Sequence, residues 1–325
     1  MNVFRMQSLL ACLFLAVFAG GILHAEDVPA KKRKILFFTR SQGFQHSTIA
    51  LKAGADKSFA QQILENLGEK NNFEVVTTKD GTFFTEEKLA PFDAIIFCTT
   101  GDLCKDGGDK QPPMPAEGKA LFLDLIKKGK GFIAMHNGAD TFHSPGGEGH
   151  GGTRNKTDEP NNYDPYINML GGEFMIHGSQ QKAKLVCYDK KFPGVADWAE
   201  GAEFQEEWYS LKNFAADMHV IFTIDTTTMH DWMYQRAPYP VTWARKFGEG
   251  RVYYTAMGHR EDVWNTPAYQ KLLVGAIDWV TKKVDADIPG NLAETAPKAS
   301  ELPVQPPKAP DAKKDPPKKD AAAAK

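Results

Sequence analysis

The sequence has few cysteines and almost no excess of charge. Its 325 residues include 4 cysteines, and 39 basic residues are balanced by 41 acidic ones to a formal net charge of -2. Because nucleic-acid binding needs a clustered basic excess, this balance argues against a nucleic-acid partner. No Gly-x-Gly-x-x-Gly turn follows the first predicted strand and no phosphate-binding P-loop occurs, so no nucleotide cofactor is indicated. A Gly-x-Ser-x-Gly nucleophile elbow is also absent.

The cysteines do not suggest a metal or a disulfide framework. Cys98, Cys104 and Cys187 remain after a predicted leader, and this odd number allows at most one disulfide, with Cys98 and Cys104 as the candidate pair. Their spacing matches no zinc motif. Buried, unpaired thiols are therefore the simpler interpretation.

No apolar run is long enough for a comfortable membrane span. The longest, residues 9–22, follows Arg5 and precedes a small-residue site at Ala25, which predicts a signal peptide over residues 1–25. A lipid anchor at Cys12 is the alternative, but the apolar run continues well past that cysteine. We therefore expect an exported protein, periplasmic or extracellular, with no transmembrane span once the leader is removed.

The other end of the chain also lacks the pattern of a folded segment. Residues 285–325 are rich in proline, lysine and alanine without periodicity, and such a composition cannot bury enough surface to order itself. We expect a disordered tail there. Residues 34–284 then form one large domain.

Within that domain, short apolar runs alternate with helical patterns. Strands are predicted at 34–39, 73–78, 92–100 and 132–135, with helices at 49–69, where Ser47 or Thr48 would be the cap, and at 116–128. Further strands are predicted at 181–188, 219–225, 239–244 and 250–257, before a closing helix at 267–282. This order predicts an α/β fold with a doubly wound, mostly parallel sheet, and the first four strands fit a flavodoxin-like layout.

Four histidines follow apolar runs or strand-ending turns: His46, His136, His177 and His259. In an open α/β sheet the carboxyl ends of the strands share one edge, where ligands bind. Imidazole rings gathered there could transfer protons or bind a divalent, zinc-like metal ion. Each histidine could instead be a satisfied turn or capping residue.

Other polar and aromatic residues are predicted at the same edge. Sugars require an apolar plate beside hydrogen-bonding groups, and the aromatic pair after Glu207 could supply it. Our candidates for catalysis are His136, His259, Asp140 and Glu207, and our candidates for substrate binding are Gly43, His46, Trp208, Tyr209 and Arg260. The candidate metal ligands are His46, His136, His177 and His259.

Several short motifs occur in an order that resembles a known family. They are Gly43-Phe44-Gln45-His46, the run from Gly131 to His136 with Asp140-Thr141, Glu207-Trp208-Tyr209, Pro240-Val241-Thr242-Trp243, and the run from Arg251 to His259. Together they resemble the ThuA-like (trehalose utilisation) family, which implies a class I glutamine amidotransferase-like three-layer sandwich. The resemblance also implies a role in sugar catabolism, on a sugar or an oxidised 3-keto-glycoside.

Two departures qualify what the resemblance implies. Class I amidotransferases have a cysteine nucleophile in the turn after the central strand, but here that turn begins at His136 and contains no cysteine, so glutaminase activity is not expected. An insert at residues 144–162 also separates this chain from shorter members. We predict a carbohydrate-active protein that uses histidine and carboxylate acid-base chemistry, with or without a metal. A non-catalytic sugar-binding or envelope scaffold module is the alternative.

Overall fold

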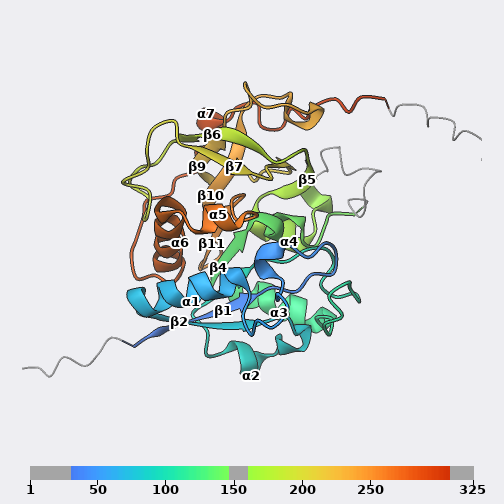
Figure 1. Ribbon diagram of the computed structural model, residues 1–325, viewed down its shortest axis with the longest axis vertical. Coiled ribbons are helices and arrows are strands. Elements are labelled where there is room, and N and C mark those ends of the chain that lie inside the picture. Colours follow the sequence, from blue (N-terminus) through green and yellow to red (C-terminus); the bar gives the residue numbers. More distant parts are fainter. Residues whose placement is uncertain (1–30, 146–159, 308–325) are drawn as a thin grey trace, which may run out of the picture. The chain divides into compact units, whose positions relative to one another are not determined.

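The computed structural model of the protein describes residues 31–145 and 160–307 (Figure 1). The predicted signal peptide, most of the insert and the end of the predicted tail lie outside these residues. Within the described part of the chain, no helix has both the length and the apolar character needed to cross a membrane.

A nine-stranded sheet forms the centre of the domain, in the order β2-β1-β3-β4-β11-β10-β9-β6-β7. Its strands are β1 (Arg33–Phe38), β2 (Phe73–Thr78), β3 (Ala94–Phe97), β4 (Gly131–Met135), β6 (Gln181–Cys187), β7 (Glu203–Glu206), β9 (His219–Ile224), β10 (Tyr239–Phe247) and β11 (Gly250–Thr255). Neighbours from β2 to β11 are parallel, whereas those from β11 to β7 are antiparallel. The predicted fold class is confirmed, including the flavodoxin-like order of the first four strands. A separate antiparallel pair joins β5 (Glu173–His177) to β8 (Tyr209–Lys212).

Helices cover both faces of this sheet. They are α1 (Phe59–Asn71), α2 (Glu86–Leu89), α3 (Ala116–Lys127), α4 (Pro165–Leu170), α5 (Glu261–Trp264), α6 (Pro267–Val280) and α7 (Leu292–Thr295). The connection through α1 and the connection through α3 run in opposite directions across the sheet, so right-handed crossovers place these helices on opposite faces. Helices α5 and α6 pack with α1, while α4 packs with α3 (Figure 1).

The central parallel strands β3, β4 and β11 are buried along their whole length because helices cover both faces of the sheet. Every residue of β3 and β4 is buried, which explains why these strands read as unbroken apolar runs. Helix α6 turns its apolar stripe to the core and buries Leu272, Leu273 and Ala276.

The first long helix begins ten residues later than the sequence suggested. Helix α1 starts at Phe59, and the side chain of Ser58 caps it by accepting a hydrogen bond from the Gln61 amide at 3.3 Å. The prediction of a helix from residue 49 is wrong, because the intervening loop contains Gly54 at a φ of +77°. Ser47 instead begins the short 3-10 helix η1 (Ser47–Ile49), which has no side-chain cap.

Part of the predicted tail packs against the domain. Residues 285–307 include α7, and Ala296 and Ala299 are buried. Asn291 accepts a hydrogen bond from the Val220 amide at 2.7 Å, which joins this segment to β9. The packed part of the chain therefore extends beyond residue 284.

Candidate metal centre and adjoining cavity

His136 lies at the carboxyl end of β4, where the chain turns sharply. Its φ of +39° is in the left-handed region that a residue with a side chain rarely adopts. Its Nδ1 lies 3.0 Å from the carbonyl oxygen of Ala256. Because a carbonyl oxygen can only accept, Nδ1 carries the proton and Nε2 presents a lone pair. That Nε2 is buried without a hydrogen-bond partner.

His46 and His259 come to the same edge from two other strands. His46 lies in the loop that follows β1 and is buried, and His259 follows β11. The imidazole ring centroids of both lie 4.9 to 5.1 Å from that of His136 and from each other. Three segments far apart in the sequence thus bring their rings to one point, as the order of the parallel strands predicts.

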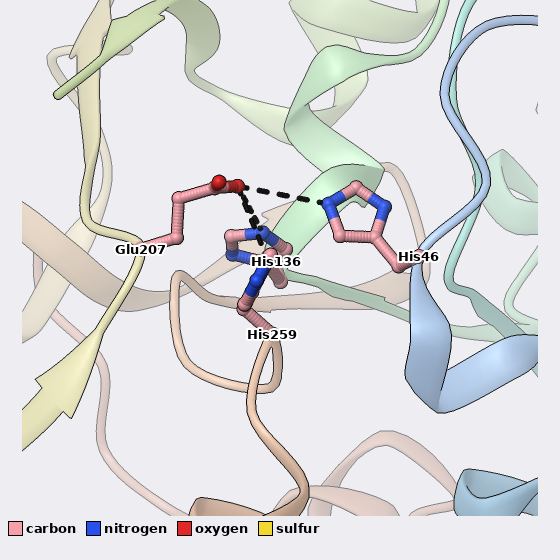
Figure 2. A group of neighbouring side chains, drawn as sticks. All are labelled: His46, His136, Glu207 and His259. Atoms are coloured by element: carbon pink, nitrogen blue, oxygen red, sulfur yellow. Dashed lines mark ion pairs between the residues drawn. The ribbon is translucent and has the colours of Figure 1, made fainter. Parts of the chain in front are cut away.

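The carboxylate of Glu207 points toward the three imidazole rings (Figure 2). It lies between β7 and β8. Its Oε2 is 3.2 Å from His259 Nδ1, 3.4 Å from His136 Nε2 and 3.7 Å from His46 Nε2. One carboxylate oxygen therefore faces a nitrogen atom of each of the three rings.

Burial sets the charge state of the cluster. It lowers the pKa of His136 to about 3 and also lowers the pKa of His46, so both rings are neutral at pH 7. Burial would raise the pKa of Glu207, but the neighbouring rings of His136, His259 and His46 outweigh it and hold that pKa below its usual range. Two neutral imidazoles and a carboxylate are the protonation states that a metal ion requires of its ligands.

Glu206 has a different task from its neighbour. In this extended segment successive side chains point to opposite sides, so Glu206 turns into the core while Glu207 faces the cluster. Its carboxylate accepts hydrogen bonds from the amides of Gly258 at 2.8 Å, His259 at 3.2 Å and Glu207 at 3.1 Å. Burial raises the pKa of Glu206 to about 7. Glu206 therefore fixes the two loops that carry His259 and Glu207.

The four side chains fit a transition-metal ion. One ligand atom from each of His46, His136, Glu207 and His259 lies within 4.8 Å of the others, and the described residues contain no other group of this kind. Ligand atoms around a tetrahedral zinc ion are about 3.4 Å apart, which the distances to Glu207 match. The unpartnered lone pair on His136 Nε2 is the kind of atom that a metal ion satisfies, and His259 Nδ1 is also buried without a hydrogen bond.

A cavity of about 690 Å³ adjoins the cluster. Its lining includes Gln42, Gly43, Phe44, His46, Asp102, Lys105, Asp140, His143, Phe174, His177, Glu207 and Tyr209. This size is typical of a site for a small organic ligand. The cluster therefore opens onto a space that a substrate could occupy, unlike a sealed structural metal site.

A chain of three polar side chains forms one wall of the cavity. His143 Nε2 lies 2.8 Å from Asp140 Oδ1, and His143 Nδ1 lies 3.0 Å from Glu173 Oε1. Glu173 is fully buried, whereas Asp140 faces the cavity. His143 therefore fixes the orientation of the Asp140 carboxylate.

The structure places the remaining candidate residues in different surroundings. His177 contacts the other oxygen of Glu207, with its Nδ1 3.5 Å from Oε1, and stands outside the four-residue cluster. Tyr209 lines the cavity and packs on His136, with ring centroids 4.1 Å apart. Gly43 also lines the cavity.

Two of the predicted substrate-binding residues do not reach the cavity. Trp208 is fully buried and donates its indole N–H to the carbonyl of Gln181, because the alternation that exposes Glu207 turns its neighbour inward. Arg260 pairs with Asp262 at 2.8 Å and does not line the cavity. Its guanidinium also donates to Gln180, whose side chain contacts His259, so it acts at one remove from the cluster.

Sequence reasoning missed several residues of the site. No pattern in the sequence singles out His143 or Glu173 as a residue of the site. Phe44 was noted only as part of a motif. The one available signal for Glu173 was an acidic residue at the start of an otherwise apolar strand.

The cysteines take no part in this site. Cys98, Cys104 and Cys187 are all free thiols, so the considered pair between Cys98 and Cys104 does not form. Burial raises the pKa of Cys98 to about 12, which keeps it protonated and unreactive.

The fold and the cluster together define an amidotransferase-like α/β domain with histidines and a carboxylate at the carboxyl edge of its sheet. The family model for ThuA, described as trehalose utilisation, matches residues 34–280. The chain belongs to this family, and the resemblance inferred from its motifs is confirmed.

Two solved structures show the same fold. A ThuA-like protein from Bacteroides uniformis is 19% identical with a TM-score of 0.57, over 79% of this chain and 94% of that one. A ThuA-like protein from Parabacteroides merdae is 18% identical with a TM-score of 0.53, over 80% of this chain and 95% of that one. A search of curated proteins finds no match.

Proposed function

We propose that this protein is an exported, metal-dependent enzyme that performs acid-base chemistry on a sugar or a 3-keto-glycoside. The observation that carries the proposal is the convergence of His46, His136, Glu207 and His259 beside a cavity. Membership of a family described by trehalose utilisation supports a sugar as the substrate. The apolar N-terminal run supports export.

The cluster would hold the ion, and neighbouring residues would handle protons. Three imidazoles and one carboxylate suit a zinc-like, first-row divalent metal. Such an ion, when bound, polarises the carbonyl oxygen of a substrate. Because His136, His259 and Glu207 then act as ligands, Asp140 remains as the predicted catalytic residue that faces the cavity and is free of the ion.

The proton chemistry follows from the position of Asp140. The C–H bond beside a keto group is acidic, so Asp140 can accept that proton while His143 holds its carboxylate in place. The electron pair left on that carbon can expel the glycosidic oxygen from the adjacent carbon. This oxygen leaves as an alcohol after protonation. Return of a proton from the other face would give isomerisation instead.

Metal analysis of the purified protein tests the proposal. We expect about one divalent ion per chain after equilibration with zinc, manganese or nickel salts, by mass spectrometry of the element. His136→Ala should lower the affinity for that ion at least tenfold, because it removes one ligand. His230→Ala, at an exposed histidine outside the cavity, is the control and should keep the ion. A wild-type protein that binds none of these ions at millimolar concentration would refute the metal assignment.

A further inference from the structure

Phe44 is an exposed aromatic ring at the rim of the cavity. Its side chain is 70% exposed, whereas a phenylalanine of a folded domain is usually buried. Among the exposed large apolar residues of the described chain, it is the one that lines this cavity. Single exposed apolar residues are common on protein surfaces, but this ring lies at a cavity, where a bound ligand could cover it.

The exposure of the Phe44 ring does not result from a loose loop. The Thr100 hydroxyl donates to the carbonyl of Phe44 at 2.8 Å, and the Gln42 amide donates to the carbonyl of Thr100 at 2.9 Å. The Gly108 amide donates to the carbonyl of Gln42 at 3.3 Å. These bonds tie the segment after β1 to the segment after β3, so the backbone that carries the ring is held in place before any ligand arrives.

The position of Phe44 connects it to the cluster. Its ring meets His46 in a perpendicular arrangement, with centroids 5.1 Å apart. Asp102, Lys105 and Asp140 line the same cavity. An apolar ring face therefore stands beside charged groups that can bond hydroxyls.

A pyranose ring has the matching chemistry. One of its faces carries C–H groups with a slight positive charge, which pack on the negative face of an aromatic ring. Its hydroxyls at the edge require hydrogen-bonding partners. Trp208, which the sequence suggested for this contact, is sealed in the core, so Phe44 is the exposed aromatic ring at the cavity rim that remains for it.

We propose that Phe44 is the stacking platform for a pyranose ring of the substrate and holds that ring next to the histidine cluster. This inference rests on the proposed sugar substrate, but not on the metal. It assigns a role in substrate specificity to Phe44, which contacts His46 but is not itself part of the histidine cluster.

The test compares Phe44→Ala and Phe44→Trp with the wild type by calorimetric titration with trehalose and with its 3-keto derivative. We expect wild type to bind at least one of them, and Phe44→Ala to bind about tenfold more weakly, a loss of about 1.4 kcal/mol. Phe44→Trp keeps an aromatic face and should stay within about threefold of wild type. Leu51→Ala, at an exposed apolar residue outside the cavity, should change nothing.

Two results would overturn the platform. One is equal affinity of Phe44→Ala and wild type for the sugar that wild type binds. The other is a wild-type protein that binds neither sugar. Metal content, measured on the same samples, separates this inference from the metal assignment. The Phe44 variants should retain their ion, and a protein without any ion could still bind the sugar.

Discussion

Glu173 shows how one buried carboxylate can organise a cavity wall. It is fully buried, and it accepts hydrogen bonds from Ser144 and from the Asn213 amide at 2.7 Å, besides its contact with His143. Burial raises the pKa of Glu173, but the bond to His143 and the charge of Lys212 outweigh it and lower that pKa below the ordinary 4.5. A depressed pKa means that the ionised carboxylate stabilises the fold above pH 4.5, and that this stabilisation is lost as the pH falls further.

Glu173→Gln should therefore destabilise the protein in a pH-dependent way. The amide presents N–H groups to donors that need an acceptor, so we expect a loss of about 3 kcal/mol in the free energy of unfolding at pH 7. The difference from wild type should shrink as the pH falls below 4.5 and the wild-type carboxylate also becomes protonated. Urea unfolding at a series of pH values measures this. Glu249→Gln, at an exposed glutamate, is the control, and a pH-independent difference would contradict the argument.

At the scale of residues, the sequence indicates which side chains end strands but not which distant ones they meet. Apolar runs that stop at His136 and His259 were enough to expect these rings at one edge. The contact between His143 and Glu173 joins residues 30 positions apart across an insert, and no local pattern predicts it. The bond between the Thr100 hydroxyl and the Phe44 carbonyl likewise joins residues 56 positions apart.

At the scale of elements, the start of α1 depends on a single cap. Ser58 has extended backbone angles and its hydroxyl accepts from the Gln61 amide, which satisfies one of the free N–H groups of the first turn. The sequence predicts Ser47 or Thr48 as the cap, and Ser58 is not among these candidates. The prediction is wrong because Gly54 interrupts the stretch between residue 49 and Ser58 that could otherwise be helical.

Ser58→Ala should lower the free energy of unfolding by about 1 kcal/mol, the usual effect of removing a helix N-cap. Ser47→Ala is a matched control, since Ser47 is exposed and caps no helix with its side chain, and it should change stability by less than half as much. Denaturant unfolding of both variants at neutral pH gives the comparison. Equal losses would mean that the first turn of α1 does not rely on Ser58.

At the scale of the whole molecule, the sheet explains why the site forms and which part of it could be predicted from the sequence. Parallel strands β1, β4 and β11 run in one direction, so the segments that follow them reach a common edge with three histidines. Alternation of strands and helices is visible in sequence, which is why the fold could be predicted. Glu207 enters from the antiparallel part, whose pairing order depends on contacts between strands that no short pattern encodes.

The C-terminal segment contacts β9 in the antiparallel part of the sheet. His219, the first residue of β9, has its Nδ1 2.8 Å from the carbonyl of Pro289, and Asn291 bonds the backbone of Val220 in both directions. Ala296 and Ala299 then become buried. Composition alone predicts disorder here because proline, lysine and alanine dominate the segment. A few buried alanines do not alter that average composition.

A chain that ends at residue 284 should therefore be less stable than one that ends at residue 307. The shorter chain loses three hydrogen bonds to β9, which correspond to about 3 kcal/mol at roughly 1 kcal/mol per bond, and the exposure of buried apolar surface adds to this loss. Because the cluster lies at the opposite end of β9 from His219, the metal content of the two chains should be equal when both are folded. Thermal unfolding with metal analysis on the same samples tests both statements. Equal midpoints would show that the segment rests on the domain without stabilising it.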